Sequence, residues 1–141
     1  MNAVFLLAFW LFLLAALAVG WQAGDRHDRR IILAIAAAAA LSAAAHMFFR
    51  ESVALVLVVM IDSALLAVVV RYALSSRRYW PLWFAAFHGT ALLFAFAALF
   101  LPAEQHIIPE RIAGFWSIPA LIIMIVGLIA DQRRGVIGPE R

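Results

Sequence analysis

The sequence predicts an all-α, single-domain polytopic membrane helix bundle with five transmembrane helices, with the N-terminus out and the C-terminus in. Hydrophobic residues make up 67% of the 141 residues and charged residues only 13%, with a mean hydropathy of +1.02. This composition leaves too little polar surface to coat a soluble globule. Dividing the chain at its charges gives five apolar runs, each long enough to cross roughly 30 Å of hydrocarbon. The predicted helices are about 2–23, 31–49, 52–72, 80–101 and 112–130.

The arginines predict the orientation, because short, positively charged loops stay in the cytoplasm. Only Arg50 and Arg111 fall on one side of the predicted bundle, and the other arginines share the opposite side. We therefore expect a multipass protein of a cytoplasmic (inner) membrane. The arginines on the expected cytoplasmic side are Arg26, Arg29, Arg30, Arg71, Arg77, Arg78, Arg133, Arg134 and Arg141.

The first two predicted helices need separate justification. Leu6–Ala18 is similar to a signal-peptide core, but no positive residue precedes it and cleavage would reverse the arginine distribution, so we expect a membrane helix. The run 31–49 is mostly alanine, which partitions weakly into lipid but lets backbones approach closely. We expect it to insert as a hairpin with 52–72 and to lie centrally, touching several helices.

The last three runs carry the informative single residues. Asp62 lies near the middle of 52–72, and an ionisable group at bilayer depth is a functional-site hypothesis by default. Pro81 lies in the first turn of 80–101, where its missing N–H costs nothing. Pro119 lies inside 112–130 and frees the carbonyl of Phe115, which predicts a possible helix kink.

Asp62, His88, Ser42 and His46 form the candidate intramembrane polar site. The lean of helical side chains favours a hydrogen bond from Ser42 to Asp62. The alternative pairs Asp62 with His88, roughly 5 Å apart in depth, as a proton relay would require. His46 and His88 differ by about 15 Å in depth, which argues against one haem between them and leaves ligation by a single histidine open.

The connections between the runs are short, at about seven, two, seven and ten residues counted from the approximate boundaries, so no extramembrane catalytic domain fits. The chain has no cysteine and shows no metal-ligand, phosphate-binding or nucleophile motif. We expect no enzyme activity, no metal and no resident cofactor. The net charge of +3 comes from arginines that we assign to membrane topology, so we expect no nucleic-acid partner.

Two segments of the C-terminal half carry a resemblance. Arg78-Tyr79-Trp80-Pro81-Leu82-Trp83, His88 and Phe115-Trp116-Ser117-Ile118-Pro119 are similar to segments of small uncharacterised multipass membrane proteins of bacteria. The resemblance implies that these positions form a unit and implies no activity.

Three functional hypotheses follow. The first is a non-catalytic accessory or scaffold subunit that binds lipid and either another membrane protein or a second copy of itself. The second is a proton-coupled transporter or channel component that uses Asp62 and His88. The third is a haem- or quinone-binding membrane subunit. The small size favours the first, because five helices without inverted repeats are few for a complete transporter.

Overall fold

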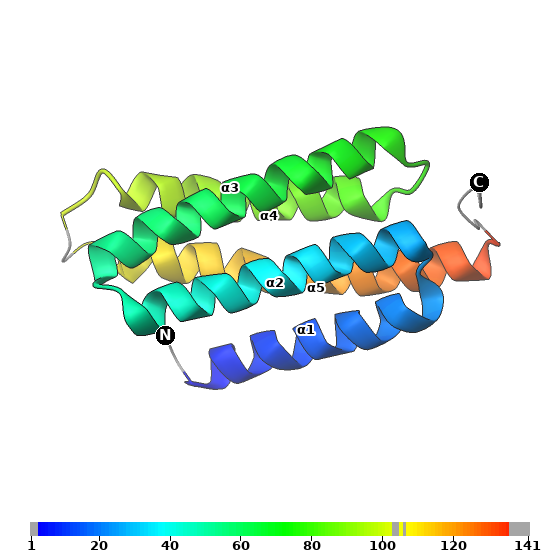
Figure 1. The fold of residues 1–141 in the computed structure, drawn as a ribbon, viewed down its shortest axis with the longest axis horizontal. Coiled ribbons are helices and arrows are strands. Elements are labelled where there is room, and N and C mark those ends of the chain that lie inside the picture. Colours follow the sequence, from blue (N-terminus) through cyan, green and yellow to red (C-terminus); the bar gives the residue numbers. More distant parts are fainter. Residues whose placement is uncertain (1–2, 103–104, 106, 136–141) are drawn as a thin grey trace.

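The computed structural model describes residues 3–102, 105 and 107–135, and these form an all-α bundle (Figure 1). Within this part of the chain, five helices are long and apolar enough to cross a membrane. The predicted fold class is confirmed at this level. The helices are α1 (Ala3–Ala23), α2 (Arg26–Phe48), α3 (Glu51–Ser75), α4 (Trp80–Ala98) and α5 (Ile107–Arg133).

The helices follow one another around a closed ring. Each helix packs against its neighbours in sequence, and α5 returns to pack against α1, which contacts α5 more extensively than it contacts α2. The α4–α5 interface is the largest and the α1–α2 interface the smallest of these five. The expectation that the alanine-rich helix lies centrally is therefore wrong. Short connections keep α2 between α1 and α3, and its small side chains give it less surface with which to reach further helices.

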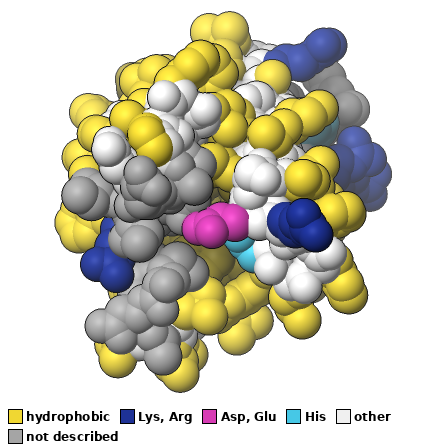
Figure 2. All heavy atoms as spheres, turned by 90° about the vertical axis from the view of Figure 1, so that its left-hand side faces the viewer, with side chains coloured by type: hydrophobic (Ala, Val, Ile, Leu, Met, Phe, Trp, Pro, Cys, Tyr) yellow, Lys and Arg dark blue, Asp and Glu magenta, His cyan; other side chains and the backbone are white. Residues whose placement is uncertain are grey.

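The connections sort onto two ends of the bundle (Figure 1). The α1–α2 and α3–α4 connections lie at the end where α5 finishes, which we call the arginine-rich end. The α2–α3 and α4–α5 connections lie at the opposite end. Figure 2 looks at that opposite end, where hydrophobic side chains cover much of the described surface and charged side chains are few and separated.

Two helices begin about five residues earlier than their hydrophobic runs predict. Asp25 caps α2, because its Oδ1 accepts hydrogen bonds of 2.8 Å from the backbone N–H groups of His27 and Asp28. Asp28 Oδ2 in turn accepts from the backbone N–H of Asp25 at 3.1 Å, which completes a capping box. Only Gly24 and Asp25 therefore separate α1 from α2, instead of seven residues.

Helix α5 starts at Ile107, ahead of the predicted residue 112, and includes Pro109 in its first turn. A proline is tolerated there because the first N–H groups of a helix have no intrahelical partner. The helix also continues through Pro119 without ending. In a membrane helix such a proline is accommodated by neighbouring helices and local adjustment of the backbone.

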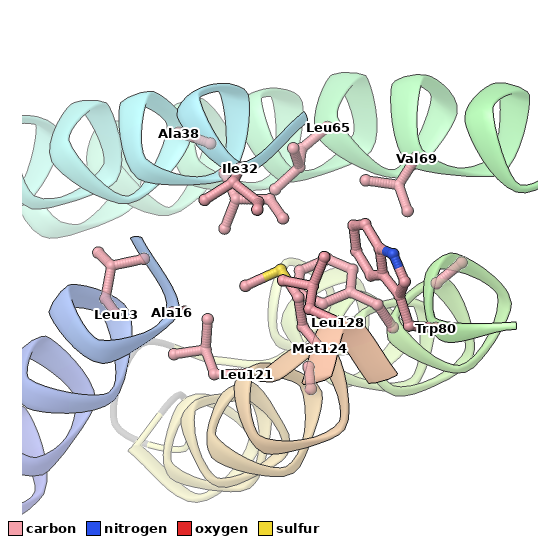
Figure 3. Close-up of a cluster of buried hydrophobic side chains, with 14 residues drawn as sticks. Leu13, Ala16, Ile32, Ala38, Leu65, Val69, Trp80, Leu121, Met124 and Leu128 are labelled. Carbon is pink, nitrogen blue, oxygen red and sulfur yellow. The ribbon is translucent and has the colours of Figure 1, made fainter. Parts of the chain in front are cut away.

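All five helices contribute to the main apolar core (Figure 3). This core lies nearer the arginine-rich end. Leu13 of α1 and Leu121 of α5 lie on facing sides of the α1–α5 interface, and Trp80 extends from α4 toward Val69 of α3. A smaller cluster joins α3 to α4 further along the bundle. It consists of Leu55, Val59, Ala95 and Ala98.

The close approach of α4 to α5 depends on Gly127. A Cβ atom at this position would overlap the Cβ of Trp80 and come within 3.4 Å of the Trp80 Cα. Neither atom is the free end of a flexible side chain, so a larger residue would push the two helices apart. Trp80 is only 2% exposed and belongs to the main core, which couples this contact to the packing of all five helices.

We expect Gly127→Ala to lower the thermal unfolding temperature of the detergent-solubilised protein, because overpacking a tight interface costs about 1–3 kcal/mol. Gly89→Ala is the matched control, since its Cβ would meet the side chain of Leu66 at an ordinary 3.8 Å. That variant should unfold at the same or a higher temperature, because alanine favours the helix over glycine. Equal effects of the two substitutions would contradict the proposed role of Gly127.

Candidate functional site

Arg78 lies in the α3–α4 connection, and only 6% of its side chain is exposed. Its guanidinium contacts three carboxylates. Nη1 lies 2.9 Å from Asp28 Oδ2 and 3.6 Å from Asp131 Oδ2, and Nη2 lies 3.2 Å from Asp25 Oδ2. Planar guanidinium groups suit this role because their donors point in several fixed directions at once.

Asp28 is the most deeply placed of these carboxylates, with no exposed surface. Each of its oxygens is bound. Oδ1 accepts a 2.7 Å hydrogen bond from the hydroxyl of Tyr72, and Oδ2 contacts Arg78 and the backbone N–H of Asp25. A buried carboxylate is stable only when its oxygens are satisfied in this way. We call Arg78, Asp25, Asp28, Asp131 and Tyr72 the Arg78 cluster.

The Arg78 cluster joins segments that are far apart in the sequence. Asp25 lies in the α1–α2 connection, Asp28 in α2, Tyr72 in α3 and Asp131 near the end of α5. One guanidinium from the α3–α4 connection therefore fixes the relative positions of these elements at the arginine-rich end. From the sequence, only Arg78 of this cluster was given a role, as a marker of membrane topology. The available clue was that Asp25, Asp28 and Asp131 all fall on one predicted side of the membrane together with Arg78.

The second polar site lies between α3 and α4. His88 Nε2 is 4.0 Å from Asp62 Oδ1 and 3.2 Å from the backbone carbonyl oxygen of Asp62. The two side chains are 11% and 26% exposed for His88 and Asp62, respectively. The structure thus brings together the pair that the side-chain lean disfavoured, because the Asp62 side chain turns toward α4 and not toward α2.

The expected hydrogen bond between Ser42 and Asp62 is absent. Within the described residues, the buried Ser42 Oγ has no hydrogen-bond partner. Ser42 is on α2, whereas Asp62 turns toward α4, so the hairpin register that places them at similar depth does not bring them together. His46 is exposed in the last turn of α2 and does not join the pair. Of the four candidate residues, the structure brings only Asp62 and His88 together.

A column of aromatic rings runs from the Asp62–His88 pair to the Arg78 cluster. Trp80, Phe84 and His88 lie one turn apart on the buried face of α4. Phe84 stacks on His88 with ring centroids 5.7 Å apart, and Trp80 contacts Phe84 at 6.5 Å and Tyr72 at 6.0 Å. Within the described residues, the buried Trp80 Nε1 has no hydrogen-bond partner.

Within residues 3–102, 105 and 107–135, no group of three or more His, Cys, Asp or Glu side chains is arranged to hold a metal ion. For a haem, His88 is the buried candidate ligand, but its Nε2 faces Asp62 and its ring stacks on Phe84. His27 is exposed in the first turn of α2, and His106 lies outside the described residues. No family model, curated protein or solved structure matches the chain.

We expect Arg78→Gln to destabilise the protein strongly, because it leaves Asp28 buried without its guanidinium partner. Removing one partner of a buried ion pair typically costs about 3–5 kcal/mol. The matched control is Arg77→Gln, which removes the same charge from the adjacent, exposed position. Thermal unfolding in the same detergent compares the two. A similar, small shift for both variants would show that the cluster does not hold this end of the bundle together.

Proposed function

We propose that this chain is a non-catalytic scaffold or accessory subunit of a membrane complex. The observation that carries the proposal is the main apolar core, to which all five helices contribute and which the Arg78 cluster closes at one end. In such a bundle the charged groups buried at the arginine-rich end pair with one another. The surface through which it acts is then its outer face.

The outer face of α2 is the best candidate for the partner surface. Ala37 and Ala40 are exposed near the middle of this helix, although α2 also packs against α1 and α3. Small residues at such positions allow the backbone of a second membrane helix to approach closely. On α3 the exposed positions mix larger residues such as Met60 and Val68 with small ones such as Ala64.

A photo-crosslinking amino acid at Ala40 tests the scaffold proposal in the native membrane. We expect a discrete protein adduct from Ala40 and none from the same amino acid at Val68, which is also exposed but lies on α3. Mass spectrometry of the adduct identifies a second copy of the chain or another membrane protein. Adducts from neither position, or the same adducts from both, would argue against docking through α2.

We further propose that the arginine-rich end faces the cytoplasm, because most of the arginines lie there and Arg50 and Arg111 lie at the other end. The chain contains no cysteine, so each introduced thiol is unique. A membrane-impermeant maleimide should label Ser52→Cys in intact cells and should label Arg77→Cys only after the membrane is opened. The reverse pattern would overturn the orientation.

Proton transfer is the second candidate function, and the 4.0 Å separation of His88 Nε2 and Asp62 Oδ1 favours it. An intramembrane acid next to a histidine is the arrangement that proton relays use. The two hypotheses differ in what the pair does: in a scaffold it only joins α3 to α4.

Under the relay hypothesis, we expect Asp62→Asn to abolish proton flux in reconstituted vesicles while leaving the unfolding temperature nearly unchanged. Ser63→Ala is the control at the next position, where the hydroxyl only donates to the Val59 carbonyl of its own helix. A lower unfolding temperature with flux equal to that of the Ser63→Ala variant would assign Asp62 a purely structural role.

A further inference from the structure

The last turns of α5 carry an open groove with a volume of about 310 Å³. Three apolar residues line its membrane part and two arginines line its end at the arginine-rich side of the bundle. The residues are Val126, Ile129, Ala130, Arg133 and Arg134. The first four repeat at the spacing of one helix face, so the groove runs along the helix axis. From Val126 to Arg133 the groove extends about 10 Å along the helix axis, with the apolar part first and the charged part after it.

The two arginines of the groove lie at its polar end and are exposed. Arg133 and Arg134 are exposed, and no described carboxylate forms an ion pair with either. Asp131 is the acidic residue nearest to them in sequence and attracts Arg134 at longer range, but its ion pair is with Arg78. Asp25 and Asp28 bind Arg78 as well. The Arg78 cluster therefore engages the described carboxylates of this end and leaves the groove positively charged.

We propose that this groove binds an anionic phospholipid, a proposal that rests on the membrane location proposed above. The phosphodiester group lies between Arg133 and Arg134, and an acyl chain follows Val126 and Ile129 toward the bilayer centre. The order of chemistry along the groove, charged and then apolar, matches the order along a phospholipid from headgroup to tail. An acidic peptide fits less well, because its backbone would have to enter the apolar part without hydrogen-bond partners.

Binding of phosphatidylglycerol to the full chain in phosphatidylcholine nanodiscs tests the proposal, with the retained lipid counted by native mass spectrometry. Each basic residue near a membrane surface contributes about 1 kcal/mol to anionic lipid binding, or roughly five-fold in affinity. We therefore expect the double variant Arg133→Gln/Arg134→Gln to bind phosphatidylglycerol about 30-fold more weakly. The matched control is Arg71→Gln/Arg77→Gln, which removes two exposed arginines from the same end and should retain the lipid.

A second pair of variants tests the shape of the groove without changing its charge. Ala130→Phe should displace the acyl chain and reduce phosphatidylglycerol retention, whereas Ala64→Phe at an exposed position of α3 should not. If both double arginine variants lost phosphatidylglycerol binding equally, the lipid would be attracted by the overall positive charge of this end, and the proposed site would be wrong. Equal retention of phosphatidylcholine, or competition by inorganic phosphate alone, would also overturn it. If the protein does not insert into nanodiscs at all, the proposed membrane location fails instead.

Discussion

Burying the guanidinium of Arg78 is the constraint on which the arginine-rich end of this bundle depends. A charge removed from water costs several kcal/mol unless opposite charges and hydrogen bonds replace the lost solvent. Here the replacement comes from carboxylates on three separate segments, so the favourable state exists only when α2, α5 and the α1–α2 connection are all in place. Asp25 adds to this coupling because the same side chain also caps α2.

The apolar core and the polar groups support each other through α4. Trp80, Phe84 and His88 occupy one buried face, and their rings connect the Arg78 cluster to the Asp62–His88 pair. Gly127 lets α5 approach Trp80 closely enough to seal this face. In a membrane the hydrophobic effect does not distinguish helix contacts from lipid contacts, so close packing and polar contacts must select the arrangement. The α4–α5 interface is the most extensive in the bundle, and it is the one in which Gly127 permits close packing against Trp80.

The interior and the outer surface of the bundle offer different chemistry. Inside, the described charged groups of the Arg78 cluster pair with one another, and His88 lies next to Asp62 between α3 and α4. Outside, the alanines of α2 offer a surface for another helix, and the groove of α5 combines two exposed arginines with apolar residues. The scaffold proposal uses the outer features, and the relay hypothesis uses the inner pair.

The sequence by itself determined the helix number, the fold class and the sorting of the connections onto two ends, because these follow from hydrophobic length and from the places where charges interrupt it. It predicted α4 to start at Trp80, and α4 does so. The early start of α2 could not be predicted from hydrophobic length, because charged residues precede the apolar run. Asp25 and Asp28 form a capping box that starts the helix among these charges. The tertiary structure alone decided that Asp62 meets His88 rather than Ser42, and that Arg78 is buried while Arg77 is exposed. Depth along a helix can be counted from the sequence, but the rotation of each helix about its axis depends on how all five pack together.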